Sequence, residues 1–554
     1  MLSRHFLLRL EATETRAICM QARIKELLVQ GDAMRQAGRW SEALISYRQA
    51  LAVLPHNAAL FHNMALCALA SFGYDEALEL SDRALRLNCS LWQSSFVKAK
   101  ALIGLNRHLE ALQILRELHD QAPDLTEVRV ELAKLLFQYA GAAAKAYALV
   151  RPLLDTQASQ DALMVGFISQ LYDRPAQVSP KMLSDSIVSF SRHHLARPLA
   201  KQSRRPPTKR SSRRLRIGLV SPQWFVSPVY FFAYGALRHL ADYADLIFFD
   251  RGTKSDWATE HFRAIANRWV SCSTVGAQEL TRLLELENLD VLVDLGGWMD
   301  PVALHALASK PARRMFKWVG GQSATTGLEV FDGFLSDKVQ TPRHSESLYS
   351  EPLVRLRSGY VTYTPPPYLP QPVASQGSSL QLGVISNPVK VSQAFLEEIA
   401  AKAPQWVALN ARRGRPLSLH FIDHRYKDSQ LRQRITSALP STCAVKFLSP
   451  ATHIEYLTAV RNLDAVLDTW PYCGGLTTME ALAMGVPVLS REGRLFCERH
   501  SWSHFYYAGL DPHAYSLEAF GGIPPLKTGR SLLHPSCKRL NHVQLAQELF
   551  RVFQ

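Results

Sequence analysis

The chain has 554 residues, of which 47% are apolar and 20% are charged. This length predicts three or four domains with cores of their own, and this composition excludes a disordered or collagen-like protein. The formal net charge of +15 raises the possibility of a nucleic-acid partner.

Neither the N-terminus nor the apolar runs predict a membrane protein. No uninterrupted apolar stretch approaches the roughly 20 residues of a membrane helix, so we expect no membrane span. The N-terminal sequence MLSRHFLLRLEATETRA lacks a convincing secretory signal, although a transit-type role stays open. The eight cysteines are scattered without a C-x-x-C pair, which favours reduced thiols in a cytoplasmic protein and argues against zinc.

Small residues recur at a spacing of 34 in the first third of the chain. Ala43, Ala77 and Ala111 keep this spacing, and two further columns keep it as well, namely Ala50 and Ala84, and Gly31, Ala65, Ala99 and Ala133. The pattern resembles the tetratricopeptide repeat, whose period is 34. It predicts a helical solenoid over 24–154 whose concave surface binds a protein or peptide partner. A purely structural helical spacer is the alternative.

A basic segment follows the repeats. Residues 197–216 carry many Lys and Arg residues, two adjacent prolines and no acidic residue. We interpret 155–213 as a helical connection that ends in a solvated basic linker. The alternative is a docking patch for an acidic partner. The segment has no aromatic residue that could stack on bases, and we therefore expect no nucleic-acid partner.

The remainder alternates apolar strands with helical stretches. The predicted strands are 215–221, 289–295, 380–386, 417–423 and 464–470, and alternation of this kind predicts parallel sheets. A proline-rich stretch at 364–379 divides the region. We therefore predict two Rossmann-like domains, at 214–370 and 376–554, with a closing C-terminal helix at 542–554 that packs on the first of them.

Residues 465–487, AVLDTWPYCGGLTTMEALAMGVP, hold the most informative motif. An apolar strand ends near Asp468, a glycine pair follows at Gly474 and Gly475, and Thr477 and Thr478 begin a helix. Glycines let the backbone approach a phosphate, and the N-terminal amides of a helix point their donors at it. The motif predicts an anion site, although an ordinary strand-to-helix connection with a Thr cap is the alternative.

The words DTWPYCGGLTTMEALAMGVPV and ISNPVKVS, together with the repeats, resemble the O-GlcNAc transferase/SPINDLY family over roughly 24–515. This resemblance implies a GT-B fold and transfer of a sugar from a nucleotide donor to Ser or Thr of proteins, with no metal or other cofactor. It also implies roles at matching positions. Lys390, Thr477 and Thr478 would hold the diphosphate beside Gly474 and Gly475, and Asn387 would lie near the phosphates or sugar. Glu480 would bind the ribose, and Tyr456 would stack on the nucleobase. Arg499 would follow the nucleotide loop.

Each of these residues also has a structural interpretation. Lys390 could be a surface charge, and Asn387 could open an Asn-Pro turn. Glu480 could complement the helix dipole. Tyr456 could belong to the core, and Arg499 could form a salt bridge.

The first α/β domain departs from the family pattern. The loop SPQWFVSPVYFF carries Ser227 where the family has a histidine, so that histidine is not available as a general base. Either the donor phosphate or water accepts the proton, or the protein is slow or uses another acceptor. The glycine-containing loop 320–327 is expected to face the cleft.

The sequence therefore predicts an inverting protein glycosyltransferase with UDP-GlcNAc as the first donor to test. Two alternatives stay open. One is the same fold with UDP-glucose or GDP-fucose, acting on an adhesin or flagellin. The other is an inactive repeat scaffold.

Overall fold

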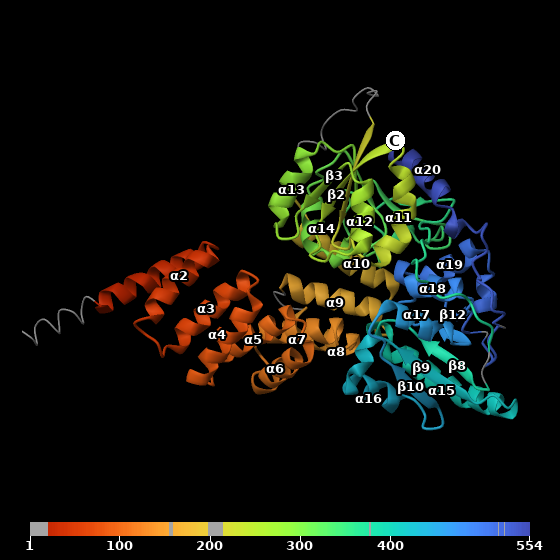
Figure 1. Cartoon of the computed structure of the whole chain (residues 1–554), viewed down its shortest axis with the longest axis horizontal. Coiled ribbons are helices and arrows are strands. Elements are labelled where there is room, and N and C mark those ends of the chain that lie inside the picture. Colours follow the sequence, from red (N-terminus) through yellow and green to blue (C-terminus); the bar gives the residue numbers. More distant parts are fainter. Residues whose placement is uncertain (1–19, 155–158, 198–213, 376–377, 519, 526) are drawn as a thin grey trace, which may run out of the picture. The chain divides into compact units, whose positions relative to one another are not determined.

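The computed structural model describes residues 20–154, 159–197, 214–375, 378–518, 520–525 and 527–554. Its contacts group the chain into two compact units, one up to Tyr139 and one from Ala140 to Gln554. Figure 1 shows helices alone in the first unit and two sheets in the second. None of the described helices is long and apolar enough to cross a membrane.

The first unit is a series of antiparallel helix pairs. Residues 20–36 are helical, and the helices that follow are α2 (Trp40–Leu51), α3 (Ala58–Ala70), α4 (Tyr74–Leu87), α5 (Trp92–Gly104), α6 (His108–Gln121) and α7 (Thr126–Gln138). The alanines at positions 43, 77 and 111 are fully buried, as are those at 65, 99 and 133. A Cβ on Gly31 would lie 2.6 Å from the Tyr47 ring. The 34-residue columns are therefore the points where helices cross closely, and the predicted repeat is confirmed.

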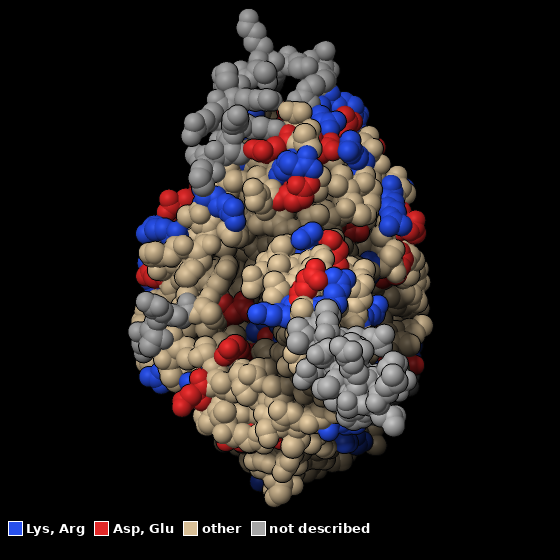
Figure 2. All heavy atoms as spheres, turned by 90° about the vertical axis from the view of Figure 1, so that its left-hand side faces the viewer, with Lys and Arg blue, Asp and Glu red and all other residues tan. Residues whose placement is uncertain are grey.

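Basic side chains on this unit have acidic neighbours. Arg39 pairs with Glu42 at 3.3 Å, and Arg107 pairs with Glu110 at 2.7 Å. Figure 2 shows Lys and Arg side chains interspersed with Asp and Glu over the described part of the face it draws. The described positive charge on that face is therefore not gathered into one patch. The basic linker at 198–213 lies outside the described residues.

The second unit opens with connecting helices, namely α8 (Ala143–Val150), η1 (Arg151–Leu153), α9 (Gln160–Tyr172), α10 (Pro180–Phe190) and η2 (Ser191–Leu195). Their aromatic side chains dock on the first α/β domain, where Phe167 and Phe190 contact the Trp298 ring at centroid distances of 4.7 and 5.8 Å. The end of α9 reaches the second domain, because Asp173 accepts a hydrogen bond from the Gln393 backbone at 3.0 Å. The connection is therefore packed against both α/β domains.

The first α/β domain is built on a seven-stranded parallel sheet with the strand order β3-β2-β1-β4-β5-β6-β7. Its strands are β1 (Leu215–Ser221), β2 (Ala244–Asp250), β3 (Arg268–Ser271), β4 (Val291–Asp294), β5 (Arg314–Lys317), β6 (Gly333–Ser336) and β7 (Leu353–Arg355). The helices are α11 (Pro228–Leu240), α12 (Trp257–Ile265), α13 (Ala277–Leu286) and α14 (Pro301–Leu307), with short turns η4 (Gly297–Met299) and η5 (Glu346–Leu348). Successive residues of β4 belong to different core clusters, so the sheet is covered on both faces.

The second α/β domain has a five-stranded parallel sheet with the order β10-β9-β8-β11-β12. Its strands are β8 (Leu380–Val384), β9 (Leu417–Ile422), β10 (Ala444–Leu448), β11 (Ala465–Leu467) and β12 (Val488–Leu489). The helices are α15 (Gln393–Arg412), α16 (Ser429–Ala438), α17 (His453–Arg461), α18 (Leu476–Ala483) and α19 (His500–Ala508), with turns η6 (Pro388–Lys390), η7 (His424–Lys427), η8 (Phe496–Glu498), η9 (Pro512–Tyr515) and η10 (Lys538–Leu540). Helical repeats followed by two Rossmann-like sheets are the predicted fold class, which is confirmed.

The C-terminal helix α20 (His542–Phe553) returns to the first α/β domain. Phe553 contacts the Phe316 ring of β5 at 5.1 Å, and Arg314 donates to the Val552 carbonyl at 2.9 Å. The chain therefore passes from the first domain to the second and then returns to the first. Its last helix thereby helps to hold the two domains together.

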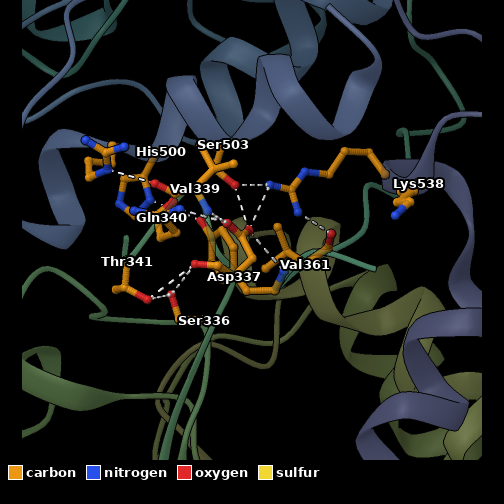
Figure 3. A network of polar contacts seen from close by, with 12 residues as sticks. Ser336, Asp337, Val339, Gln340, Thr341, Val361, His500, Ser503 and Lys538 are labelled. Atoms are coloured by element: carbon orange, nitrogen blue, oxygen red, sulfur yellow. Dashed lines mark hydrogen bonds and ion pairs between the residues drawn. The ribbon is translucent and has the colours of Figure 1, made fainter. Parts of the chain in front are cut away.

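A buried polar network joins the two domains (Figure 3). Asp337 follows β6 and accepts hydrogen bonds from the Gln340 amide at 2.7 Å and from the Ser503 hydroxyl of α19, also at 2.7 Å. The Arg539 guanidinium lies 3.7 Å from the Asp337 carboxylate and donates to Ser503 and to the Val361 carbonyl. Asp337 and Arg539 are fully buried, so this network fixes α19 against the first domain without solvent screening.

Candidate active site

A cavity of about 360 Å³ lies where the two α/β domains meet. This volume lies within the usual range for ligand pockets. The first domain and α9 line it with Tyr172, Gln223, Pro228, Phe232, Met299, residues 319–323 and Tyr360, and the second domain lines it with Ser386, Asn387, Lys390, Tyr472, Gly475, Leu476, Thr477 and His500. The cavity follows the carboxyl ends of strands β8 and β11, where ligands of parallel sheets bind.

Lys390 ends the short turn η6 directly after β8. Its ammonium donates to the Cys473 carbonyl at 2.9 Å and lies 4.3 Å from the centre of the Tyr472 ring. Burial lowers the pKa of Lys390 below its usual range, and the Asp468 carboxylate opposes that effect. An ammonium has three donors, so the bond to Cys473 leaves others for a ligand. Lys390 is therefore a fixed cationic donor in the cavity wall.

Asn387 is oriented by its neighbours. Its side-chain oxygen accepts hydrogen bonds from the Val389 backbone at 3.0 Å and from Arg425 at 2.7 Å. The turn interpretation of Asn387 is therefore correct, and it coexists with a place in the cavity wall. Because the oxygen is engaged, the amide nitrogen is the group that Asn387 has available for a ligand.

The glycine-rich turn is organised by Asp468. Its carboxylate accepts hydrogen bonds from the Gly474 amide at 2.7 Å and from the Ser501 hydroxyl at 2.6 Å. A Cβ on Gly474 would lie 2.6 Å from the Thr478 hydroxyl and 2.9 Å from that of Thr477, so only glycine fits here. The turn brings Gly475 and Thr477, at the start of α18, into the cavity wall. Gly475 and Thr477 therefore line the same cavity as Lys390.

Thr478 and Glu480 lie behind this wall. The Thr478 hydroxyl is bonded to the Ser501 hydroxyl at 2.7 Å. Glu480 is 1% exposed and bonded to His453 Nε2 at 2.8 Å. Burial raises the pKa of Glu480, and the bond from His453 opposes that effect. Both side chains lie next to the site but do not line the cavity. Their predicted ligand roles stay predictions.

Tyr456 and Arg499 also lie outside the cavity wall. The Tyr456 hydroxyl donates to the Ile385 carbonyl at 3.1 Å. Arg499 donates to the Val339 carbonyl at 2.7 Å and the Gly493 carbonyl at 2.6 Å, and it pairs with Glu492. These contacts fit the core interpretation of Tyr456 and the salt-bridge interpretation of Arg499. Their predicted contacts with a nucleotide stay predictions.

The loop at 319–323 forms part of the first-domain side of the cavity, so the first four residues of the expected loop 320–327 line it and the last four do not. Buried Lys317 holds this loop by donating to the carbonyls of Val319 at 2.8 Å and Gly320 at 2.6 Å. Ser227, at the position of the missing histidine, directly precedes α11 without a side-chain cap bond, and its hydroxyl donates to the Gln223 carbonyl at 2.9 Å. Ser227 is not among the residues that line the cavity.

Sequence reasoning did not find Tyr172, Tyr360 or His500 as cavity residues. Tyr172 stacks on Tyr472 with a centroid distance of 4.5 Å, although the two are 300 positions apart. The one available signal for His500 was its position next to Arg499, in the segment after the glycine-rich motif. Among the described residues, no group of three or more His, Cys, Asp or Glu side chains is arranged to hold a metal ion.

Comparison with known proteins gives related sequences and a related fold. No protein-family model matches the chain. The SPINDLY protein of Solanum lycopersicum, a probable UDP-N-acetylglucosamine–peptide N-acetylglucosaminyltransferase, is 27% identical over 321 residues, which are 55% of this chain and 33% of that relative. The same-named protein of Arabidopsis thaliana is 27% identical over 322 residues, 54% of this chain and 34% of its own. A solved O-GlcNAc transferase mutant from Thermobaculum terrenum has 22% identity, covers 96% of this chain and 93% of its own, and gives a TM-score of 0.56.

The fold and the cavity define a class, namely proteins that carry tetratricopeptide repeats before a GT-B pair of Rossmann-like domains. The chain is similar in sequence to SPINDLY proteins and in fold to an O-GlcNAc transferase. The match spans about a third of the length of these curated relatives.

Proposed function

We propose that the protein is an inverting glycosyltransferase that moves a sugar from a UDP-sugar, GlcNAc first, to a Ser or Thr hydroxyl of a protein acceptor recruited by its repeats. The observation that carries the proposal is that Lys390 and the Gly475–Thr477 start of α18 face one cavity. A fixed ammonium, helix amides and a hydroxyl can neutralise the charge that develops on a departing diphosphate. The names of the relatives support GlcNAc as the first donor.

The reaction would proceed by in-line attack. The acceptor oxygen forms a bond to the anomeric carbon while the bond from that carbon to the diphosphate breaks, with the electron pair leaving on UDP. Lys390, the Gly475 backbone and Thr477 would hold the leaving group, and Asn387 would donate its amide nearby. Orientation of both reactants in a cavity closed by two domains would supply much of the rate.

The test is transfer of label from nucleotide sugars to protein. Purified full-length chain is incubated with radiolabelled UDP-GlcNAc, UDP-glucose or GDP-fucose and a lysate of its host. We expect one donor to label a protein band, and we expect Lys390→Ala to reduce the labelling rate about 100-fold or more. Lys402→Ala is the matched control, because Lys402 pairs with Glu398 on the surface of α15 in the same domain.

The alternative of an inactive scaffold predicts a different result. If no donor gives label and the wild-type chain binds neither UDP nor GDP, the transferase proposal fails. If wild type and Lys390→Ala label equally well, the assignment of Lys390 fails while the activity stands.

A further inference from the structure

The cavity contains one imidazole. His500 opens helix α19, is 8% exposed, and lines the same wall as Lys390 and Thr477. Among the described residues that line the cavity there is no Asp or Glu. The other titratable side chains in the wall are an ammonium and tyrosine phenols, which are protonated near neutral pH. His500 is therefore the lining side chain best suited to accept a proton.

Tyr360 fixes the orientation of this ring. The Tyr360 hydroxyl lies 3.0 Å from His500 Nδ1 and comes from the first α/β domain, whereas α19 belongs to the second. Figure 3 shows His500 beside the network that holds α19 against the first domain. With Nδ1 engaged, Nε2 is the ring nitrogen left for a ligand. In the tautomer in which Nδ1–H donates to the Tyr360 oxygen, Nε2 carries a free electron pair.

Burial keeps the ring neutral, and nearby charges reinforce it. Burial, together with the positive charges of Lys390 and Arg539, lowers the pKa of His500 to about 3. The other titratable rings around it are neutral, and they are Tyr360, Tyr472 and His504. At neutral pH the imidazole is therefore uncharged. A diphosphate bound to Lys390 would offset that positive charge and raise the pKa of His500, which strengthens it as a base when the donor is present.

The proposed reaction requires such a group, because the acceptor hydroxyl must lose its proton as it attacks. Ser227, which stands where the family has a histidine, donates its hydroxyl proton to Gln223 and does not line the cavity. Asp468 is 3% exposed and saturated with hydrogen bonds from its own turn. Neither side chain can take the proton from a substrate in the cavity.

We infer that His500 accepts the proton of the acceptor hydroxyl and that Tyr360 positions it for this step, an inference that rests on the proposed transferase function. As the oxygen bonds to the anomeric carbon and UDP leaves with the electron pair, the hydroxyl proton moves to Nε2. The resulting imidazolium keeps its Nδ1–H bond to the Tyr360 oxygen and releases the proton to water after the products leave. The segment after the glycine-rich motif thereby supplies the base that the first-domain loop lacks.

The test measures kcat, KM and their pH dependence for the full-length chain with the donor that gives label. We expect His500→Gln to lower kcat about 100-fold or more while the affinity for UDP stays within threefold of wild type. We expect Tyr360→Phe to lower kcat about 10-fold and to move the acidic limb of the kcat profile to lower pH, because the imidazolium loses its acceptor. His513→Gln is the control, because His513 is exposed in η9 of the same domain and outside the cavity wall, and this variant should retain activity.

Two results would overturn the inference while leaving the function intact. One is an active wild type whose His500→Gln variant keeps kcat within threefold and the same pH profile. The other is a loss in His500→Gln that falls equally on UDP affinity and thermal stability, which indicates a structural role only. A wild type that labels no acceptor and binds no nucleotide is a third and distinguishable result, because it overturns the proposed function itself.

Discussion

Removing Arg539 should destabilise the second unit by leaving the Asp337 carboxylate buried without its counter-charge. The two charges lie 3.7 Å apart, and both side chains are fully buried. At an effective dielectric constant of about 20, such a pair interacts by about 4 kcal/mol. Breaking a buried pair costs about 3–5 kcal/mol. We expect about 3 kcal/mol for Arg539→Met, because the Gln340 amide and Ser503 hydroxyl continue to solvate Asp337.

The assay is differential scanning calorimetry of the full-length chain. A loss of about 3 kcal/mol in a unit of this size lowers the Tm by about 4 °C. Arg551→Met is the matched control, because Arg551 is exposed on α20, and surface substitutions usually stay within about 0.5 kcal/mol. A double-mutant cycle with Asp337→Asn then isolates the pairwise energy, and the combined loss should be smaller than the sum of the single losses by about 1 kcal/mol or more.

Two results would refute this reasoning. The first is a Tm for Arg539→Met that lies no lower than that of Arg551→Met. The second is strict additivity in the cycle, which would mean that the two groups are stabilised independently by their other hydrogen bonds. Either result would remove the ion pair as the link that fixes α19, and with it His500, against the first domain.

Three further changes probe the cavity. Gly474→Ala forces a Cβ to within 2.6 Å of the Thr478 hydroxyl, so UDP affinity measured by calorimetry should fall about 10-fold or more, and unchanged affinity would show that the turn can yield. Lys317→Met removes the donor that holds the Gly320 carbonyl, so we expect the Tm to fall by several degrees and UDP binding to weaken. Normal UDP binding would mean that other contacts hold the loop. Burial lowers the pKa of Lys390, so UDP affinity should decrease as pH rises through that lowered pKa and should do so below the usual range of lysine. Lys390→Met should abolish this alkaline decrease, and a decrease that persists in the variant would assign it to another group.

Part of the fold could be predicted from the sequence because the relevant patterns are local or periodic. The 34-residue alanine columns predict the repeats, since each column marks a helix crossing that recurs. The predicted strand at 215–221 coincides with β1, because a continuous apolar run is the pattern of a strand buried on both faces. Edge strands such as β3 and β10 were not predicted. They are half exposed, so they lack such a run.

The sequence also determined that Lys390 and the glycine-rich turn follow strands of one domain, which is enough to bring Gly475 and Thr477 to the same edge of the sheet. Only the tertiary structure decided which neighbouring side chains reach the cavity. Glu480 is turned to His453, and Arg499 is bound to Val339, because their partners come from segments that the chain brings together only on folding. His500 enters the site for the same reason, since its hydrogen-bond partner Tyr360 lies in the other domain, 140 positions earlier. Contacts across a domain interface leave no period or spacing in the sequence, so they had to be found in the structure.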